Sequence, residues 1–395
     1  MSGPEVALEL AHGALDWLLT ETRPAGSGPD LYSGASGTAL TLLEGHHAFG
    51  DDAYAAAAER TARTIAAAVD ETGADSLYFG LSGMAFALHT VGDRLGEPWA
   101  AAAGRRALDR VRSRFDGERW SDLFELLGGN AGIALAALAM GDGDLAVLAV
   151  EPYLRRAETT PHGVTWQHRR GVDSRLHHIS HGALGIAHSL AAVGRATGRA
   201  DLVAAARAGA AEVVSRDEAG PDGFLVPHSD PPYRPELIER YSYGWCHGPT
   251  GDAQVFRLLA AVTGDPAWPA LADRCWHTVT HSGLPRRLRP GFWDNSGRCC
   301  GTAGVLAFAC DQYAAGRADL SFARILVDDL RARATVDAAG ARWSNHEHRV
   351  TPSDLAPEPG WAMGNAGIAR ELLRYARTAA GEPSGYVVDW PDRPL

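Results

Sequence analysis

The chain has 395 residues, 46% hydrophobic and 22% charged, which is enough apolar sequence for a packed core and gives no indication of disorder. Its 37 basic and 48 acidic residues give a net charge of −11, and no long basic run favours nucleic acid as a partner. The start, Met1 to Val6, lacks a basic segment followed by an apolar core, and no apolar run could span a bilayer. We therefore expect a cytoplasmic protein without a signal peptide or membrane insertion. Five cysteines, an odd number, argue against a disulfide framework and leave metal binding or catalysis open.

A Gly-x-x-Gly motif recurs along the chain. It is plain in Leu31-Tyr32-Ser33-Gly34-Ala35-Ser36-Gly37 and again in Leu77-Tyr78-Phe79-Gly80-Leu81-Ser82-Gly83. The first glycine of the motif falls at seven positions, which are 34, 80, 129, 182, 248, 301 and 364. Self-similarity of this kind is the sequence signature of a repeat architecture.

Two kinds of helix alternate along this repeat. A segment that is apolar on most faces follows each motif, which predicts a buried inner helix. Amphipathic segments lie between them and predict outer helices that rest on the inner ones. In chain order, beginning with an outer helix, we expect helices at 5–20, 35–47, 52–70, 81–93, 96–115, 130–141, 145–157, 183–195, 197–215, 250–263, 265–281, 302–315, 317–333 and 365–379.

Seven inner and seven outer helices predict an all-α fold class, an α/α toroid in which two rings of helices close on one another. We expect a single domain over 1–395, with residues 381–395 as an extended tail. Glycine should be needed in the motif because the backbones come close there and because it permits unusual dihedral angles. The seven turns should lie at one end of the ring, so that the residues just before each motif converge on its centre.

Four long connections carry Pro, Gly, Arg, His and Trp, and loops of this length in a compact domain are usually functional or mobile. They span 158–180, 216–245, 283–298 and 336–360. Three of them lead into the last motifs, so we expect the substrate groove there.

Three cysteines directly precede two of the motifs. Cys246 and Cys299 occupy equivalent positions in neighbouring repeats, and Cys300 is next to Cys299. Zinc prefers Cys and His ligands in tetrahedral geometry, and a catalytic zinc keeps one position open. We therefore predict that these three hold one Zn²⁺, and the alternative is that they are small buried residues at tight turns. Cys275 and Cys310 lack the motif and are expected in the core.

Histidines and carboxylates near the same motifs are candidates for proton transfer. His181 precedes Gly182 and could act as acid or base or as a fourth zinc ligand. His247 follows Cys246 directly and could contact the substrate. Glu125 lies four residues before Gly129, with Asp122 as a second candidate, and either could instead cap or solvate the turn. At most one of the nearby His177 and His178 is expected to reach the site.

The chain resembles the lanthionine synthetase C-like cyclases over essentially all of 31–380. The resemblance rests on His181-Gly182-Ala183-Leu184-Gly185, on Trp245-Cys246-His247-Gly248-Pro249-Thr250-Gly251 and on Cys299-Cys300-Gly301-Thr302-Ala303-Gly304. It implies an α/α barrel with a central zinc that joins a peptide cysteine to dehydroalanine or dehydrobutyrine as a thioether ring. The family's zinc ligands fall on Cys246, Cys299 and Cys300, and its acid/base histidine falls on His181. The third ligand is commonly His, but a subgroup of the family has three cysteines.

The chain departs from the family pattern at three positions. His247 stands where many members have Tyr. Ser242 stands where an active-site Arg is often found, and Arg240 is close but out of register. Glu125 stands where Asp is common. These differences affect the details of proton transfer and not the zinc ligands.

The chemistry that the resemblance implies follows from charge. Only a thiolate attacks efficiently, and binding to zinc deprotonates the substrate thiol. Three protein thiolates against Zn²⁺ should leave the substrate thiolate weakly held and reactive. After it adds to the β-carbon, His181 would protonate the α-carbon, with His247 in support. The repeats occupy the chain, so we expect a separate dehydratase as partner and a dehydrated precursor peptide as substrate.

Three other functions remain open from the sequence. One is the addition of glutathione to dehydrated residues, as in the eukaryotic branch of the family. A carbohydrate-active toroid would need two carboxylates facing each other across a groove, for which Glu125 and Asp122 are too close in sequence. A non-catalytic, zinc-stabilised scaffold that binds a peptide would be favoured if His181 closed the metal site.

Overall fold

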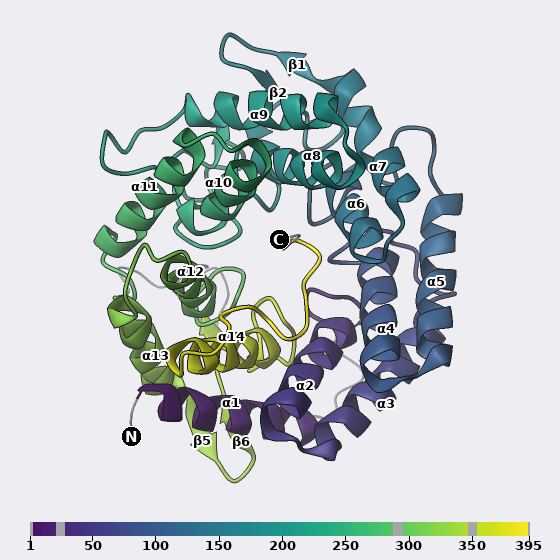
Figure 1. The fold of residues 1–395 in the computed structure, drawn as a ribbon, viewed down its shortest axis with the longest axis vertical. Helices are drawn as coiled ribbons and strands as arrows, with labels where there is room; N and C mark the ends of the chain where they lie inside the picture. Colours follow the sequence, from purple (N-terminus) through teal and green to yellow (C-terminus); the bar gives the residue numbers. More distant parts are fainter. Residues whose placement is uncertain (1–2, 21–27, 287–294, 347–353, 394–395) are drawn as a thin grey trace. The chain divides into compact units, whose positions relative to one another are not determined.

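The chain is described by a computed structural model over residues 3–20, 28–286, 295–346 and 354–393. Within these ranges it is predominantly helical (Figure 1). The helices are α1 (Gly3–Thr20), α2 (Ala35–Phe49), α3 (Asp52–Ala68), α4 (Leu81–Leu95), α5 (Pro98–Ser113), α6 (Asn130–Ala139), α7 (Gly143–Arg156), α8 (Ala183–Thr197), α9 (Ala200–Val214), α10 (Pro249–Thr263), α11 (Ala267–His281), α12 (Thr302–Ala314), α13 (Ser321–Arg333) and α14 (Asn365–Ala379).

All fourteen predicted helices are present, and their ends differ by a few residues for local reasons. Gly198, at φ 71°, ends α8 in the left-handed conformation, so α9 begins at 200 and not at 197. Asp319 accepts a hydrogen bond from the backbone N–H of Ser321 at 2.8 Å, and α13 begins there and not at 317.

Four small antiparallel ladders, which the sequence analysis did not predict, lie in the long connections. They pair β1 (Glu158–Thr159) with β2 (Val164–Thr165), β3 (Arg175–Leu176) with β4 (Ser229–Asp230), β5 (Thr335–Asp337) with β6 (Gly340–Arg342), and β7 (Asn345–His346) with β8 (Asp354–Leu355). The β3–β4 ladder joins the connections 158–180 and 216–245. Parts of the other two connections predicted to form the groove, 287–294 and 347–353, lie outside the described residues.

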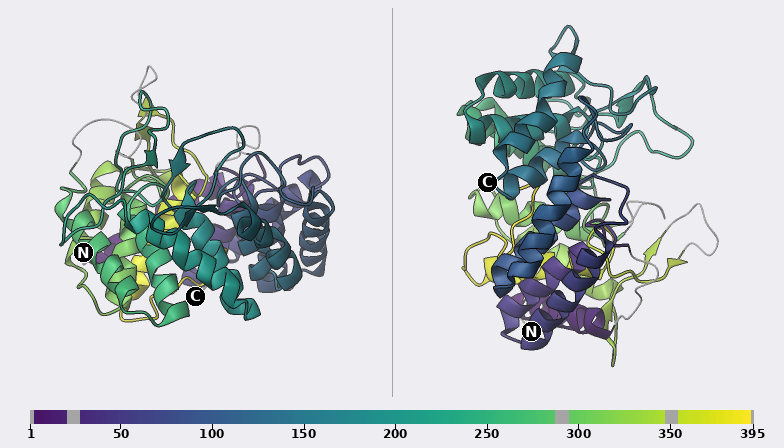
Figure 2. Two further views of the ribbon diagram at one scale, coloured as in Figure 1. Left: turned by 90° about the horizontal axis from the view of Figure 1, so that it is seen from above. Right: turned by 90° about the vertical axis from the view of Figure 1, so that its right-hand side faces the viewer.

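The chain divides into two compact units. The first contains 1–71, 87–104 and 283–389, and the second contains 72–86, 105–282 and 390–395. In the second unit, α8 packs against α6 and α10, and α7, α9 and α11 cover α6, α8 and α10 in turn (Figure 1). In both views of Figure 2 the long loops of this unit extend from one end of its helices.

In the first unit, α14 packs against α1, α2 and α12, while α3 covers α2 and α13 covers α12. The inner helix α14 buries three charged side chains, which are Arg370, Glu371 and Arg374. Arg374 forms an ion pair with Asp311 at 2.5 Å, and Arg370 lies 3.7 Å from the carboxylate of Glu44. Glu44 also accepts the backbone N–H of Val387 at 3.1 Å. The segment after α14 is therefore held against the helices of its own unit by hydrogen bonds to buried charges.

A backbone ladder links the motifs inside the second unit. The residue two positions before a motif donates its N–H to the carbonyl oxygen of the equivalent residue in the next repeat. Tyr78 donates to Leu127 at 3.2 Å, Leu127 to Ser180 at 3.2 Å, and Ser180 to Cys246 at 3.3 Å. In the first unit, Cys299 donates to Ala362 and Ala362 to Tyr32, both at 2.8 Å. Within each unit, the predicted convergence of the residues before the motifs is therefore observed.

The motif glycines serve close packing and not unusual dihedral angles, which corrects that part of the expectation. None of them lies in the left-handed region of φ, and Gly248, for example, is extended at φ 172°. A Cβ on Gly251 would overlap the carbonyl oxygen of Trp245 and lie 2.5 Å from Cγ2 of Ile179. The first turn of each inner helix thus packs directly on the backbone that precedes it.

Candidate active site and metal centre

Cys246 lies at the end of the backbone ladder in the second unit, two residues before Gly248, the N-cap of α10. It is 3% exposed, and its carbonyl oxygen accepts hydrogen bonds from both the N–H and, at 2.7 Å, the hydroxyl of Ser180. Thr250, in the first turn of α10, donates its hydroxyl to the carbonyl oxygen of Tyr243 at 2.6 Å and closes the turn around the cysteine. A helix N-terminus carries partial positive charge and therefore favours a thiolate at this position.

His181 and Glu125 come from two neighbouring motifs of the same unit. Nδ1 of His181 lies 3.2 Å from Oε2 of Glu125, with the imidazole 34% exposed and the carboxylate fully buried. The carboxylate also accepts the backbone N–H groups of Leu127 at 2.7 Å and Gly128 at 2.9 Å. A carboxylate with these donors is acceptor-only, so Nδ1 of His181 carries the proton and Nε2 can exchange one.

His247 lies within a group of imidazoles. Its ring stacks on that of His181, with 5.5 Å between ring centroids, and its edge contacts are with His228 at 4.2 Å and His178 at 6.0 Å. Desolvation lowers the pKa of His247 well below its usual range, and the imidazoles of His228, His181 and His178 lower it further. The residue keeps partial solvent exposure. A neutral His247 can offer a hydrogen bond beside Cys246 without adding charge.

Two further histidines lie in this group: His178, one of the two neighbours of which at most one was expected here, and His228, which was not predicted. His178, buried three residues before His181, forms a 2.8 Å contact from Nδ1 to Oδ2 of the buried Asp252 in α10. Its Nε2 has no hydrogen-bond partner among the described residues. His228 enters from the connection between α9 and α10. Asp252 lies four residues after Gly248, so its position in the repeat was a usable signal, whereas His228 lies in a loop with no repeat position.

Other candidates lie away from this group. The Nδ1 of His177 lies 2.7 Å from the carbonyl oxygen of Pro227, so this side chain anchors a loop. Asp122 is 67% exposed, and its carboxylate lies 3.9 Å from Arg170. Arg240 forms an exposed ion pair with Glu218 at 2.6 Å. Asp122 and Glu125 thus have different surroundings, and their arrangement gives no support to a glycosidase pair of carboxylates.

Cys299 and Cys300 lie in the first unit, directly before the N-terminus of α12. Each is 1% exposed, and their Sγ atoms are 3.4 Å apart. The hydroxyl of Tyr32 donates to Sγ of Cys299 at 3.3 Å. Beneath them, the guanidinium of Arg298 is held by a fully buried ion pair with Glu371 at 2.7 Å. This pair fixes the backbone from which both thiols project.

The donor chemistry of these thiols fits zinc. All five cysteines are free thiols, and 3.4 Å between sulfurs is far longer than the roughly 2.05 Å of a disulfide. Two thiolates on a tetrahedral zinc, with Zn–S of about 2.3 Å, lie about 3.8 Å apart. Among the described residues, Cys246, Cys299 and Cys300 are buried metal-ligating side chains that could hold a metal ion. Cys275 and Cys310 are core residues as expected, and burial raises the pKa of the Cys310 thiol to about 12.

Comparison with solved structures defines the fold. Nisin cyclase matches with a TM-score of 0.69 at 13% identity, covering 95% of this chain and 94% of that one. An unsaturated glucuronyl hydrolase specific for heparin matches with a TM-score of 0.54 at 12% identity, covering 95% and 98%. The chain is an α/α toroid, the fold that nisin cyclase shares with glycosidases. None of the described helices has the length and hydrophobicity needed to cross a membrane.

The sequence itself defines the family. The family described as "Lanthionine synthetase C-like protein" matches residues 27–231 and 234–327, more than half of the chain. The chain therefore belongs to the lanthionine synthetase C-like family, and the resemblance seen in its motifs is confirmed. No curated protein matches the sequence. Family membership supports a role of the cyclase type that acts on a peptide, and the three buried cysteines are consistent with a zinc site.

Proposed function

We propose that the protein is a zinc-dependent cyclase that adds a peptide cysteine to dehydroalanine or dehydrobutyrine and so forms lanthionine or methyllanthionine rings. One observation carries this proposal. Within the second unit, the thiol of Cys246 and the His181–Glu125 pair are presented by neighbouring motifs that a backbone hydrogen bond joins. A metal ligand and an oriented acid are the two groups that a thiol addition needs.

Cys246, Cys299 and Cys300 would hold the zinc, and all three are buried before the N-termini of helices. Zinc bound there would supply a deprotonated substrate thiol at neutral pH. Tyr32 donates a hydrogen bond to Cys299 and would keep its sulfur oriented. The substrate would take the fourth position, which is why no histidine is assigned as a ligand.

The chain's own groups would then complete the addition. When the substrate sulfur bonds to the β-carbon of the dehydro residue, the electron pair of the double bond moves toward the α-carbon and its carbonyl. His181 would deliver a proton from Nε2 to the α-carbon, while Glu125 holds Nδ1–H and stabilises the imidazolium form. His247, stacked on His181, would offer a hydrogen bond to the reacting peptide. Both partners lie in one peptide, so positioning supplies much of the rate.

The reaction is tested with a synthetic peptide that contains one dehydroalanine and one cysteine. Ring closure leaves the mass unchanged, so the product is treated with a thiol-alkylating reagent and analysed by mass spectrometry. The proposal expects an unalkylated product that forms only with wild-type protein and zinc, and His181→Asn should abolish it. A peptide that stays fully alkylated would contradict ring closure. Adding glutathione to the same assay separates the alternative, since a glutathione adduct without ring closure would assign intermolecular addition instead.

The dehydro residues must come from a dehydration reaction, which we assign to a separate partner enzyme acting on the same precursor peptide. The site consumes an alkene and a thiol and contains no group that activates a serine hydroxyl for elimination among the residues assigned to it. Co-incubation of the cyclase with the precursor, before and after dehydration, tests this order. Rings should form only after dehydration.

A further inference from the structure

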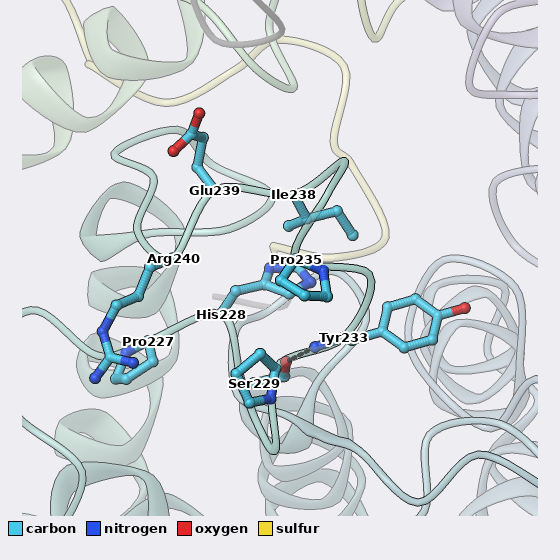
Figure 3. A pocket seen from close by; sticks show the side chains of 9 residues that line it. Pro227, His228, Ser229, Tyr233, Pro235, Ile238, Glu239 and Arg240 are labelled. Atoms are coloured by element: carbon cyan, nitrogen blue, oxygen red, sulfur yellow. Dashed lines mark hydrogen bonds between the residues drawn. The ribbon is translucent and has the colours of Figure 1, made fainter.

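A pocket lies beside the histidine group in the loop between α9 and α10 (Figure 3). It encloses about 210 Å³, less than the roughly 300–1,000 Å³ of sites for drug-sized ligands, so it fits a side chain and not a whole cofactor. The lining residues all come from one loop of the second unit: Pro227, His228, Ser229, Pro232, Tyr233, Pro235, Ile238, Glu239 and Arg240.

Hydrogen bonds fix the shape of this loop. At its base, Ser229 pairs with Leu176 in the β3–β4 ladder, and the N–H of His228 donates to the carbonyl oxygen of Arg240 at 2.8 Å. Inside the loop, the N–H of Tyr233 donates to Oγ of Ser229 at 2.8 Å, as Figure 3 shows. The N–H of Ile238 donates to the carbonyl oxygen of Arg234 at 3.0 Å. The pocket is thus formed before any ligand arrives, and binding need not order the loop.

The walls favour an apolar occupant. Three prolines contribute rings and no N–H donors, and Ile238 and Tyr233 add aliphatic and aromatic surface. The guanidinium of Arg240 already forms an ion pair with Glu218 at 2.6 Å and donates a hydrogen bond to the hydroxyl of Tyr241 at 2.8 Å. Burial lowers the pKa of His228 to about 3, so the buried end of the pocket is neutral. Glu239 is also in the lining, so an anionic group entering here would lose water and face a carboxylate.

His228 connects this pocket to the candidate active site. It is buried, it lines the pocket, and its ring meets that of His247 with 4.2 Å between centroids. Its Nε2 has no hydrogen-bond partner among the described residues. His247 directly follows Cys246. Consecutive Cα atoms of a peptide are about 3.8 Å apart. The distance between the rings of His228 and His247 therefore corresponds to one or two residues along a bound peptide.

We propose that this pocket binds an apolar side chain of the substrate peptide at the residue next to the reacting cysteine, and so selects which cysteine is brought to the metal. The proposal rests on the proposed cyclase function for the identity of the ligand. It goes beyond that function because it assigns a sequence preference to one loop. Ile238 and Tyr233 are then specificity-determining residues, and His228 is a positioning residue between the pocket and His247.

The test uses two synthetic dehydroalanine peptides that differ only at the residue before cysteine, which is Leu in one and the neutral, polar Asn of similar size in the other. Binding is measured by fluorescence anisotropy with inactive analogues that carry Ser for dehydroalanine, and ring closure is measured by alkylation. Wild-type protein should favour the Leu peptide by about ten- to a hundredfold in both assays, the effect of burying one apolar side chain.

Ile238→Glu should remove this preference. The matched control is Leu237→Glu, which makes the same change one residue earlier, at a side chain that is 44% exposed and does not line the pocket. Leu237→Glu should keep the wild-type preference. Tyr233→Ala, which removes a wall without adding charge, gives a second variant if circular dichroism shows that Ile238→Glu is misfolded.

The outcomes separate the two proposals. Equal binding of both peptides to wild-type protein, or a preference that both Ile238→Glu and Tyr233→Ala retain, would overturn the pocket assignment even if rings form. A preference in binding that Ile238→Glu removes, with no ring closure on either peptide, would keep the pocket and overturn the cyclase function. Loss of the preference in Leu237→Glu as well would show a general charge effect and would also overturn the pocket.

Discussion

The Nδ1 of His181 lies 3.2 Å from Oε2 of Glu125, and each oxygen of this buried carboxylate also accepts a backbone N–H from the third motif. The orientation of the Glu125 carboxylate toward His181 is therefore fixed. Two backbone donors and the imidazole converge on Glu125, and an ionised carboxylate there accepts from all three and holds His181 with Nδ1 protonated. The turn that orients the general acid is part of the repeat itself.

Replacing Glu125 with Gln should reduce the ring-closure kcat about a hundredfold or more, with a smaller effect on KM. The amide NH₂ would have to face one of the three donors, and a neutral side chain would no longer stabilise the imidazolium form of His181. General acid catalysis contributes at least about that factor. Steady-state kinetics on the dehydroalanine peptide measure the change.

Glu125→Asp is the control for this experiment, because it keeps the charge and shortens the side chain by one methylene. It should retain more kcat than Glu125→Gln and keep a pH–rate profile with a basic limb. If Gln at 125 supports wild-type kcat, then the carboxylate does not orient the acid, and His181 acts without it or not at all.

Gly251→Ala should destabilise the protein by about 2 kcal/mol or more, although alanine normally favours a helix over glycine. The new Cβ would overlap the carbonyl oxygen of Trp245 and the side chain of Ile179. Gly143→Ala, in α7 with no atom within 4 Å of the added Cβ, is the matched control and should be neutral or stabilising. Chemical unfolding measures both, and equal effects would contradict the close-packing role of the motif glycine.

Low pH should lower the free energy of unfolding of the second unit, because it contains buried neutral histidines. Among these, His188 lies apart from the group of imidazoles around His247. Its Nε2 lies 2.8 Å from the carbonyl oxygen of Asp392, and burial lowers its pKa to about 4, although Asp392 acts in the opposite direction. The folded pKa lies below the unfolded value of about 6.5. The unfolded chain therefore binds the proton first, and stability that is complete above pH 6.5 is lost as the pH falls toward 4.

For this one group the loss at pH 5 should be about 2 kcal/mol relative to pH 7. The free energy of unfolding at pH 7 and pH 5, measured for wild-type protein and His188→Gln, tests the assignment. The variant should be less stable at pH 7 and lose less on acidification. A parallel pH dependence of the two proteins would show that His188 is not the titrating group.

Glu371→Gln should destabilise the protein by about 3–5 kcal/mol, because it leaves the guanidinium of Arg298 buried without its counter-charge. Arg298 directly precedes Cys299, so metal affinity should fall together with stability. Thermal unfolding with and without added zinc checks this. Asp337→Asn, which breaks an exposed pair with Arg342, is the control and should change stability far less than Glu371→Gln.

The helices were predicted well because each repeat contains two independent indications of a helix, the motif glycine at which it begins and the pattern of apolar residues along it. Each inner helix begins at a motif glycine and is apolar on most faces, and each outer helix carries one apolar stripe. The helix ends at Gly198 and Asp319 were missed by a few residues because they depend on single capping interactions. The two-residue ladders could not be predicted, since a strand of that length has no periodicity.

Those residues of the candidate site that lie next to a Gly-x-x-Gly motif could be predicted from the sequence. His181 stands one residue before its motif and Glu125 four residues before the neighbouring one, and the structure brings the two side chains together. His228 comes from a loop whose position depends on the β3–β4 ladder, which only the folded chain reveals. The role of the motif glycines was predicted wrongly in part, because the sequence cannot distinguish a glycine needed for a positive φ from one needed for close approach.

The three-cysteine zinc site is tested by the zinc content of purified wild-type protein and of the Cys300→Ala variant. We expect one zinc per wild-type chain, and weaker or absent zinc binding in the variant together with loss of thioether formation. Cys310→Ala, which removes a core thiol outside the motifs, should keep the metal. Protein without zinc, or a Cys300→Ala variant that binds zinc and closes rings like wild type, would contradict the three-cysteine site.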